Sequence, residues 1–275
     1  LRAANADAGA MREQILAAAE QVSPASHGQT VASEAQQFLR WVADQHFVFM
    51  GSRHYQVQGK GAKARLVADE GSGLGLMRGK PRAPSRPVAE LAAEGLHQRG
   101  SLDAPVIVTK TNARSQIHRG GYMDYIGVLS FDKEGRITGE QRFVGLFANS
   151  AWGVRPWDVP LVRQRVNAVM QRSGLDANGH SGKALRHILE TLPRVELFQS
   201  TEDELFATAM GLLGLRERVA ARLFLRRDRF SRFDSVLVYL PRERFNTDLR
   251  LRIEALLRDV LQGEFVDSSV VLGES

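Results

Sequence analysis

The spacing of the apolar residues changes from a helical to an alternating pattern near residue 46, and this change orders the first half of the chain. Over residues 30–45 apolar side chains recur every three or four positions, which predicts a helix that Thr30 could cap. From Phe47 to Val57 the pattern alternates, which predicts a strand. A helix therefore leads directly into a sheet.

Four further segments favour strands in the same region. The segments are 66–67, 105–109, 122–131 and 136–147, and Asp132–Gly135 between the last two has the composition of a hairpin turn. The Gly- and Pro-rich residues 70–87 read as a loop, followed by a short helix over 88–96. We expect residues 30–157 to form an antiparallel α+β domain, after a helix over 8–22 and a linker within residues 1–29.

A helical connector is expected over residues 158–192. Its first helix would start at Asp158 as a cap, with Pro160 in the first turn, and would end at Gly174. The second helix would end before Pro193. Two helices would thus join the sheet domain to the rest of the chain.

Residues 193–275 show an order of elements typical of a ferredoxin-like fold. Strands are expected at 195–198, 219–227, 233–240 and 265–272. Helices are expected after a cap at Ser200 or Thr201 and after a cap at Asn246. The order is βαββαβ, so the fold class is α+β throughout.

Composition limits the kinds of chemistry that the chain could perform. It has 275 residues, enough for one large domain or two ordinary ones, and no cysteine. Thiolate nucleophiles and cysteine-ligated metals are therefore excluded, and a reducing compartment fits. No long apolar run or signal peptide is present, so we expect a cytoplasmic protein without a membrane partner. The chain begins at Leu1 and stops after a strand-like run, so both ends are interpreted as cut from a larger protein.

The net charge of +6 leaves two interpretations of the arginine-rich residues 216–258. They could form a basic module that binds nucleic acid, with Phe224, Phe230 and Phe233 available for stacking on bases. Acidic residues are interspersed among them, which favours an ordinary solvated surface. Nucleic acid is the less favoured partner.

The common catalytic and phosphate-binding motifs are absent. The Gly-rich residues 71–80 lack the glycine spacing of a dinucleotide fingerprint, and Pro81 stands where a Walker loop needs a hydroxyl. The seven histidines show no HExxH spacing, and no GxSxG sequence occurs. We therefore expect no catalytic, cofactor-binding or metal-binding residues in this chain.

One stretch combines cationic, hydroxyl and aromatic side chains on a loop that enters a strand. It could line a small-molecule cavity, form a docking face for another domain, or be a surface loop held by hydrogen bonds. The candidate residues are Lys110, Arg114, His118, Tyr122, Asp124 and Tyr125.

Several motifs resemble the large NAD-specific glutamate dehydrogenases of bacteria and recur in family order from about residue 30 to 260. They are Phe38-Leu39-Arg40-Trp41, His46-Phe47-Val48-Phe49-Met50-Gly51, Thr109-Lys110-Thr111-Asn112-Ala113-Arg114-Ser115, Tyr122-Met123-Asp124-Tyr125-Ile126-Gly127-Val128, Gly139-Glu140-Gln141-Arg142-Phe143-Val144-Gly145-Leu146-Phe147, Gly182-Lys183-Ala184-Leu185, Glu196-Leu197-Phe198-Gln199 and Arg226-Arg227-Asp228-Arg229-Phe230 leading to Asn246-Thr247.

The resemblance implies that the chain is an amino-terminal, non-catalytic segment of such an enzyme, which oxidises L-glutamate with NAD to 2-oxoglutarate and ammonia. It implies a PAS-like domain, then an ACT-like domain over 193–275, with a regulatory or assembly role. The implied partners are other domains and subunits of a homo-oligomeric enzyme, and a small-molecule effector. The loop Gln199–Glu202 stands where effector-binding ACT modules usually have glycine, which disfavours an effector at that loop.

Overall fold

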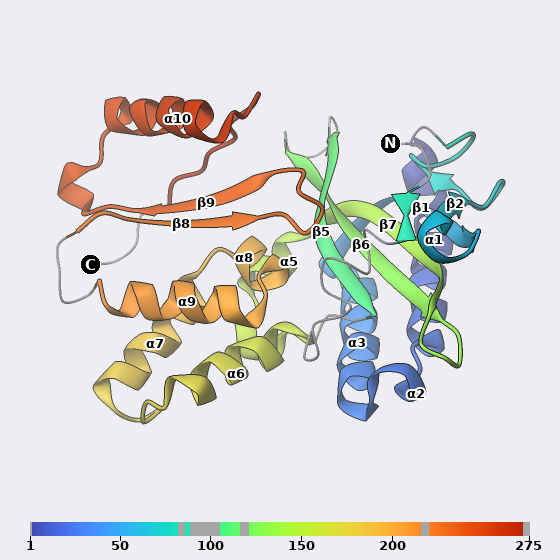
Figure 1. The fold of residues 1–275 in the computed structure, drawn as a ribbon, viewed down its shortest axis with the longest axis horizontal. Helices are drawn as coiled ribbons and strands as arrows, with labels where there is room; N and C mark the ends of the chain where they lie inside the picture. Colours follow the sequence, from blue (N-terminus) through green and yellow to red (C-terminus); the bar gives the residue numbers. More distant parts are fainter. Residues whose placement is uncertain (1, 82–85, 89–104, 116–120, 216–219, 272–275) are drawn as a thin grey trace.

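A computed structural model describes residues 2–81, 86–88, 105–115, 121–215 and 220–271. An antiparallel sheet carries helices on one face, and a separate two-stranded hairpin lies beside it between further helices (Figure 1). The helix expected at 88–96 lies outside the described residues except for Val88. The α+β class is confirmed.

Three helices begin the chain: α1 (Arg2–Gln21), α2 (Pro24–His27) and α3 (Gln29–Trp41). Met11 and Ile15 of α1 and Phe38 and Leu39 of α3 are fully buried, as their helical spacing predicts. The Thr30 cap is wrong, because the N-cap position lies two residues earlier, at Gly28. Its φ of 81° favours glycine, which has no side chain to cap the helix. An irregular turn over Val42–His46 then leads into the sheet.

The sheet contains the five expected strands and two additional strands of two residues. Its order is β4-β2-β1-β7-β6-β5, with β3 paired to β1. Gly135 in the turn between β6 and β7 has a φ of 77°, as a hairpin glycine should. The bounds are β1 Phe47–Gln58, β2 Arg65–Ala68, β3 Leu74–Gly75, β4 Arg86–Pro87, β5 Val106–Arg114, β6 Tyr122–Phe131 and β7 Ile137–Phe147.

The two faces of the sheet belong to different apolar clusters. Ile126 and Phe143, which pair across β6 and β7, are both fully buried in the main core with α1, α3 and the later helix α6 (Val162–Ser173). Tyr125 and Val144, one position along, belong to a second cluster that includes Leu66 and contacts Phe230. Alternation along each strand produces this division.

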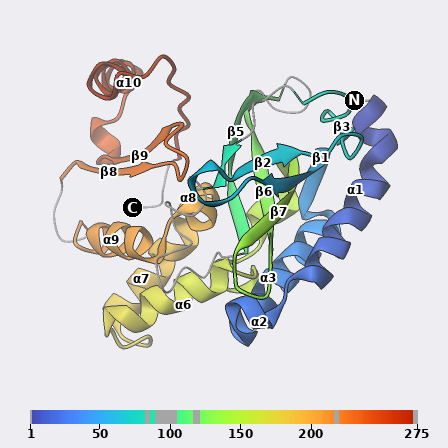
Figure 2. The ribbon, with the colours of Figure 1, turned by 45° about the vertical axis from the view of Figure 1, so that its right-hand side comes forward.

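A set of helices follows the sheet (Figure 2): α5 (Asn149–Gly153), α6 (Val162–Ser173), α7 (His180–Thr191), α8 (Arg194–Gln199) and α9 (Glu202–Leu213). The Asp158 cap is wrong, because Pro156–Asp158 form a separate 3₁₀ turn and α6 starts only at Val162. Gly174 ends α6 in the left-handed conformation as expected. Thr201 and Glu204 form a capping box at α9.

The strand expected at 195–198 is wrong, because these residues form helix α8. The N–H of Ser200 donates to the carbonyl of Glu196 at 2.8 Å, which is helical bonding. Glu196, Leu197 and Phe198 are all buried.

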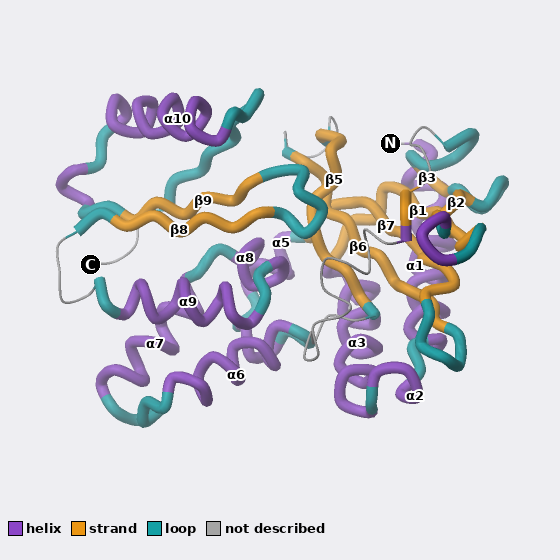
Figure 3. The backbone as a smooth tube through the Cα atoms, viewed as in Figure 1, coloured by secondary structure: helices purple, strands orange, loops and turns teal. Residues whose placement is uncertain are grey.

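A hairpin of β8 (Arg222–Arg227) and β9 (Asp234–Tyr239) leads through a 3₁₀ turn (Arg242–Arg244) to α10 (Thr247–Leu261), which Asn246 caps. Figure 3 shows a loop after α10 where the last strand was expected, and residues 265–271 form no strand. The βαββαβ order is therefore wrong at both ends in the described part of the chain. With α8 helical, the expected first strand is not available as a neighbour for the last one.

Candidate functional site at the contact between sheet and hairpin

The turn of the hairpin contacts the edge strand of the sheet through a buried carboxylate. Asp228, 3% exposed, accepts a hydrogen bond from the Thr109 hydroxyl of β5 at 2.5 Å. Arg232 donates to Asp228 at 2.9 Å and to Thr109 at 3.1 Å. Figures 1 and 2 both show the end of the hairpin at β5. Residues more than a hundred positions apart thus form one polar contact.

Local structure at the turn orients Asp228. Its backbone accepts from Ser231 at 2.7 Å, and its side chain accepts from the N–H of Phe230 at 3.0 Å. Burial alone would raise the pKa of Asp228, but the hydrogen bonds from Arg232 and Thr109 outweigh it and hold the pKa below its usual value. The carboxylate is therefore ionised at neutral pH.

A second buried pair joins helix α8 to the hairpin. Glu196 accepts two hydrogen bonds from Arg226, at 2.9 and 3.1 Å, and one from Ser235 at 2.6 Å. Burial opposes ionisation of Glu196, yet these donors lower its pKa. Each strand of the hairpin thus supplies one partner for the same carboxylate.

Arg165 of α6 lies in the same region. It donates to the carbonyl of Leu197 at 2.7 Å, and burial together with Arg229 and Arg226 lowers its pKa to about 9. This region therefore places positive charge in the interior between α6, α8 and the hairpin.

The sequence-predicted residues do not converge on one pocket. Lys110 pairs with Asp124 at 2.5 Å on the sheet face that carries the helices. Tyr125 points to the other face, where its hydroxyl donates to Glu140. Arg114 lies over the rings of Tyr122 and Phe265 and pairs with Asp267 at 3.4 Å. His118 lies outside the described residues.

Asp124 and Lys110 form an ion pair in which the carboxylate is buried. Asp124 is 3% exposed and also accepts the N–H of Phe147 at 2.9 Å. Burial raises the pKa of Asp124, against the opposing influence of Lys110. These contacts hold β5, β6 and β7 together.

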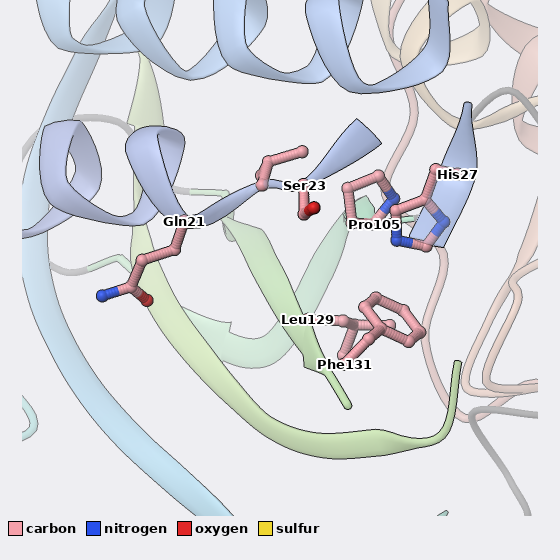
Figure 4. A pocket seen from close by; sticks show the side chains of 7 residues that line it. Gln21, Ser23, His27, Pro105, Leu129 and Phe131 are labelled. Carbon is pink, nitrogen blue, oxygen red and sulfur yellow. The ribbon is translucent and has the colours of Figure 1, made fainter. Parts of the chain in front are cut away.

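A small cavity lies between α1, α2 and the end of the sheet (Figure 4). Its volume is about 30 Å³, and His27 and Phe131 line it with their rings in edge-to-face contact, the ring centroids 4.4 Å apart. Burial lowers the pKa of His27. A space of this size suits one water molecule and not a metabolite. The lining residues are Gln21, Val22, Ser23, His27, Pro105, Leu129 and Phe131.

The Gly-rich loop is filled by protein side chains. Arg53 of β1 donates to the carbonyls of Met77 and Gly79. A Cβ on Gly73 would overlap the Met77 carbonyl and the Arg53 guanidinium, which explains the glycine there. The backbone carbonyl groups of the loop point at the Arg53 guanidinium, whereas a phosphate-binding loop points its N–H groups at the ligand. The loop therefore does not fit the pyrophosphate of NAD.

The N-terminal helix holds the same loop from outside. Asp7 of α1 accepts the N–H of Gly75 at 2.8 Å and two bonds from Arg78 at 2.6 Å. In the part of the chain that the structure describes, no three His, Asp or Glu residues gather as a metal site. No helix of that part is long and apolar enough to cross a membrane.

The residues at the sheet–hairpin contact were not singled out as a site from the sequence. Asp228 and Glu196 each lie within a motif that carried the family resemblance. A single acidic residue in a basic or apolar segment does not indicate which distant residue it will pair with. Only the fold reveals that Thr109, Asp228 and Arg232 meet.

Comparison with known proteins first defines a class. Residues 159–218 match the family model for helical motif 1 of glutamate dehydrogenase. Residues 222–275 match the model for the ACT2 domain of glutamate dehydrogenase. The helices after the sheet and the hairpin with α10 therefore carry sequence of this class.

The particular relatives are NAD-specific glutamate dehydrogenases. The chain is 38% identical to that of Halomonas elongata over 100% of its own length and 17% of the relative. It is 37% identical to that of Pseudomonas aeruginosa over 88% of the chain and 15% of the relative. It is 30% identical to that of Mycobacterium tuberculosis over 87% of the chain and 14% of the relative. The chain thus spans about one sixth of these proteins, and the predicted resemblance to a segment of NAD-specific glutamate dehydrogenases is confirmed.

The nucleic-acid alternative receives no support from these matches. Three of the arginines that suggested it are also engaged: Arg226 with Glu196, Arg227 with Asp234 at 3.0 Å and Arg232 with Asp228. Phe224 packs against Tyr239 and α9. Stacking platforms for bases need exposed rings, which Phe224 is not.

Proposed function

We propose that this chain is an amino-terminal regulatory and assembly segment of an NAD-dependent glutamate dehydrogenase. The whole enzyme would convert L-glutamate and NAD to 2-oxoglutarate, ammonia and NADH, and this segment would catalyse no step by itself. Similarity over the full length of the chain to NAD-specific glutamate dehydrogenases carries the proposal. We also propose a cytoplasmic location, because a chain without cysteine suits a reducing compartment.

The polar groups of the chain support a docking role. Asp228, Glu196 and Asp124 each have cationic partners within the chain, and Arg53 fills the loop that could have held a phosphate. We propose that the stretch from Lys110 to Tyr125 provides a docking face for the ACT2 region. Arg114 contacts Phe265 and Asp267, and Tyr125 contacts Phe230. Lys110 and Asp124 hold together the strands that carry these side chains. We further propose the division into 1–29, a PAS-like domain over 30–157, a connector over 158–192 and an ACT-like domain over 193–275.

Regulation would act through this docking. A change in the position of the hairpin would move β5 through Thr109 and Asp228, and α8 through Glu196 and Arg226. Other domains and subunits of a homo-oligomeric enzyme are the proposed partners. At the loop before α9 the helix N-terminus is already capped by Thr201 and Glu204, which disfavours an anionic effector there.

Turnover by the isolated chain tests the proposal. The purified chain is mixed with L-glutamate and NAD, and NADH is followed by its absorbance; we expect none. Formation of NADH by this chain would refute the non-catalytic role. The enzyme from a complete reading frame that contains this segment should form NADH under the same conditions, and a frame without dehydrogenase activity would refute the parent function.

Titration calorimetry distinguishes a segment that binds an effector from a segment that acts only as a scaffold. The chain is titrated with glutamate, aspartate, arginine and nucleotides. Saturable heat with one of them supports an effector-binding segment. No heat with any of them removes that version and supports a scaffold.

A further inference from the structure

Exposed apolar side chains concentrate in the ACT2 region. Eight of the eleven large apolar side chains that are exposed among the described residues lie between Leu223 and Val271. Helix α10 has no buried residue at all. Leu256 is 62% exposed and Val260 is 67% exposed. Leu256 and Val260 lie four residues apart on one side of the helix, so they form an exposed apolar pair suited to an interaction surface.

The exposed side of α10 has a definite charge pattern. Arg252, Leu256, Asp259 and Val260 follow one another at spacings of four, three and one residues, so they share one side of the helix. Arg250 and Glu254 on the other side already pair with each other at 2.7 Å. Within the described part of the chain, Arg252 and Asp259 form no ion pair. One cation and one anion thus flank an apolar residue.

We propose that α10 packs antiparallel against α10 of a second copy of this chain. A two-fold axis near Leu256 reverses the helix, so it brings Arg252 of each copy to Asp259 of the other. Leu256 and Val260 of both copies would lie between the two ion pairs. A partner helix with charges of one sign would pair with either Arg252 or Asp259 but not with both. A second copy of α10 pairs with both residues, so two Arg252–Asp259 ion pairs form across the two-fold axis.

This inference rests on the assembly role proposed above and names one surface that performs it. The contact of two single helices is small, so we expect a Kd on the order of tens of micromolar for the isolated chain. The contact would be stronger where other interfaces of an oligomer hold the two copies together.

Charge reversal tests the pairing. Sedimentation of the chain over micromolar concentrations should show a monomer–dimer equilibrium. Arg252→Asp places acids opposite Asp259, and Asp259→Arg places cations opposite Arg252. Each change should weaken the dimer at least about tenfold, because the attraction becomes repulsion at two sites. The double variant R252D/D259R should restore the dimer, and the two single variants mixed together should form a heterodimer.

Controls on the same helix make the result decisive. Arg258→Asp changes an exposed charge of α10 outside the proposed face and should leave the dimer intact. Leu256→Glu should abolish the dimer through its apolar centre. Circular dichroism checks that each exposed substitution leaves the helices folded. A chain that stays monomeric, or a dimer that R252D and D259R leave unchanged, would overturn the proposal. Neither result depends on dehydrogenase activity, so the proposed function is tested separately.

Discussion

Glu34 in helix α3 accepts the backbone N–H of Leu161 at 2.9 Å, across 127 residues of sequence. Leu161 precedes α6 with a φ of 66° and a ψ of −48°, a strained combination for a residue with a side chain. Arg163 donates to the same carboxylate at 2.8 Å. The start of α6 is thus capped by a side chain from another helix, because its own N-cap residue is a leucine.

Replacing Glu34 should destabilise the fold. Glu34→Gln removes the charge that faces Arg163 and a helix N-terminus, both partly shielded from water, so we expect a loss of about 2–3 kcal/mol. The midpoint temperature of thermal unfolding should fall by several degrees. Glu20→Gln, in the exposed pair with Arg40, is the matched control and should change stability by less than about 0.5 kcal/mol. Equal shifts for the two variants would contradict this account of α6.

The contact of Asp228 should contribute stability that depends on pH. Its folded pKa lies below the unfolded value near 4, so the contribution is complete above that value and is lost as pH falls through the folded pKa. Asp228→Asn should therefore cost about 2 kcal/mol at pH 7, and the difference from wild type should shrink below about pH 4. Urea unfolding at a series of pH values measures it; a constant difference down to pH 2 would refute the assignment.

Lys110 and Asp124 should show the opposite pH dependence. The folded pKa of Asp124 is raised, so its protonated form is favoured in the fold and stability from this group falls as pH rises. Lys110→Met removes the cation that pairs with that carboxylate and should enlarge this fall. We expect K110M to lose more stability at pH 7 than at pH 4. Arg136→Met, at an exposed pair, is the control and should behave like wild type.

Gly73 should tolerate no side chain. Gly73→Ala would place Cβ on the Met77 carbonyl and the Arg53 guanidinium, so we expect a loss of about 2–4 kcal/mol or a rearranged loop. Gly153→Ala, whose Cβ would meet nothing within 4 Å, is the control. Both are measured by thermal unfolding. A neutral G73A would show that Arg53 does not occupy the loop.

Periodicity predicted the long elements well because burial alone determines them. The stripe of α3 repeats over at least three periods and the alternation of β1 begins at Phe47, and most of their hydrophobic residues are buried as expected. The capping box at Thr201 was also readable, because both partners lie within four residues.

The predictions that were wrong share one physical cause: contacts with residues far away in the sequence determine these elements. Three of residues 195–198 are apolar, and the segment is short enough for either a strand or a helix. The helix that forms carries Glu196, whose partners Arg226 and Ser235 come later in the chain. The cap of α6 could not be predicted either, because it comes from Glu34. The candidate site failed to converge for the same reason: Lys110 and Tyr125 contact different faces of one sheet.

The pairing of β1 with β7 has a consequence for synthesis of the protein. Phe47 lies beside Phe147, so one side of β1 stays without its neighbour until the ribosome has made β7. At ordinary translation rates this takes on the order of 5–20 s. A nascent chain would present an unsatisfied, apolar strand for that time, which is when it is most open to misassembly with a neighbour on the same message.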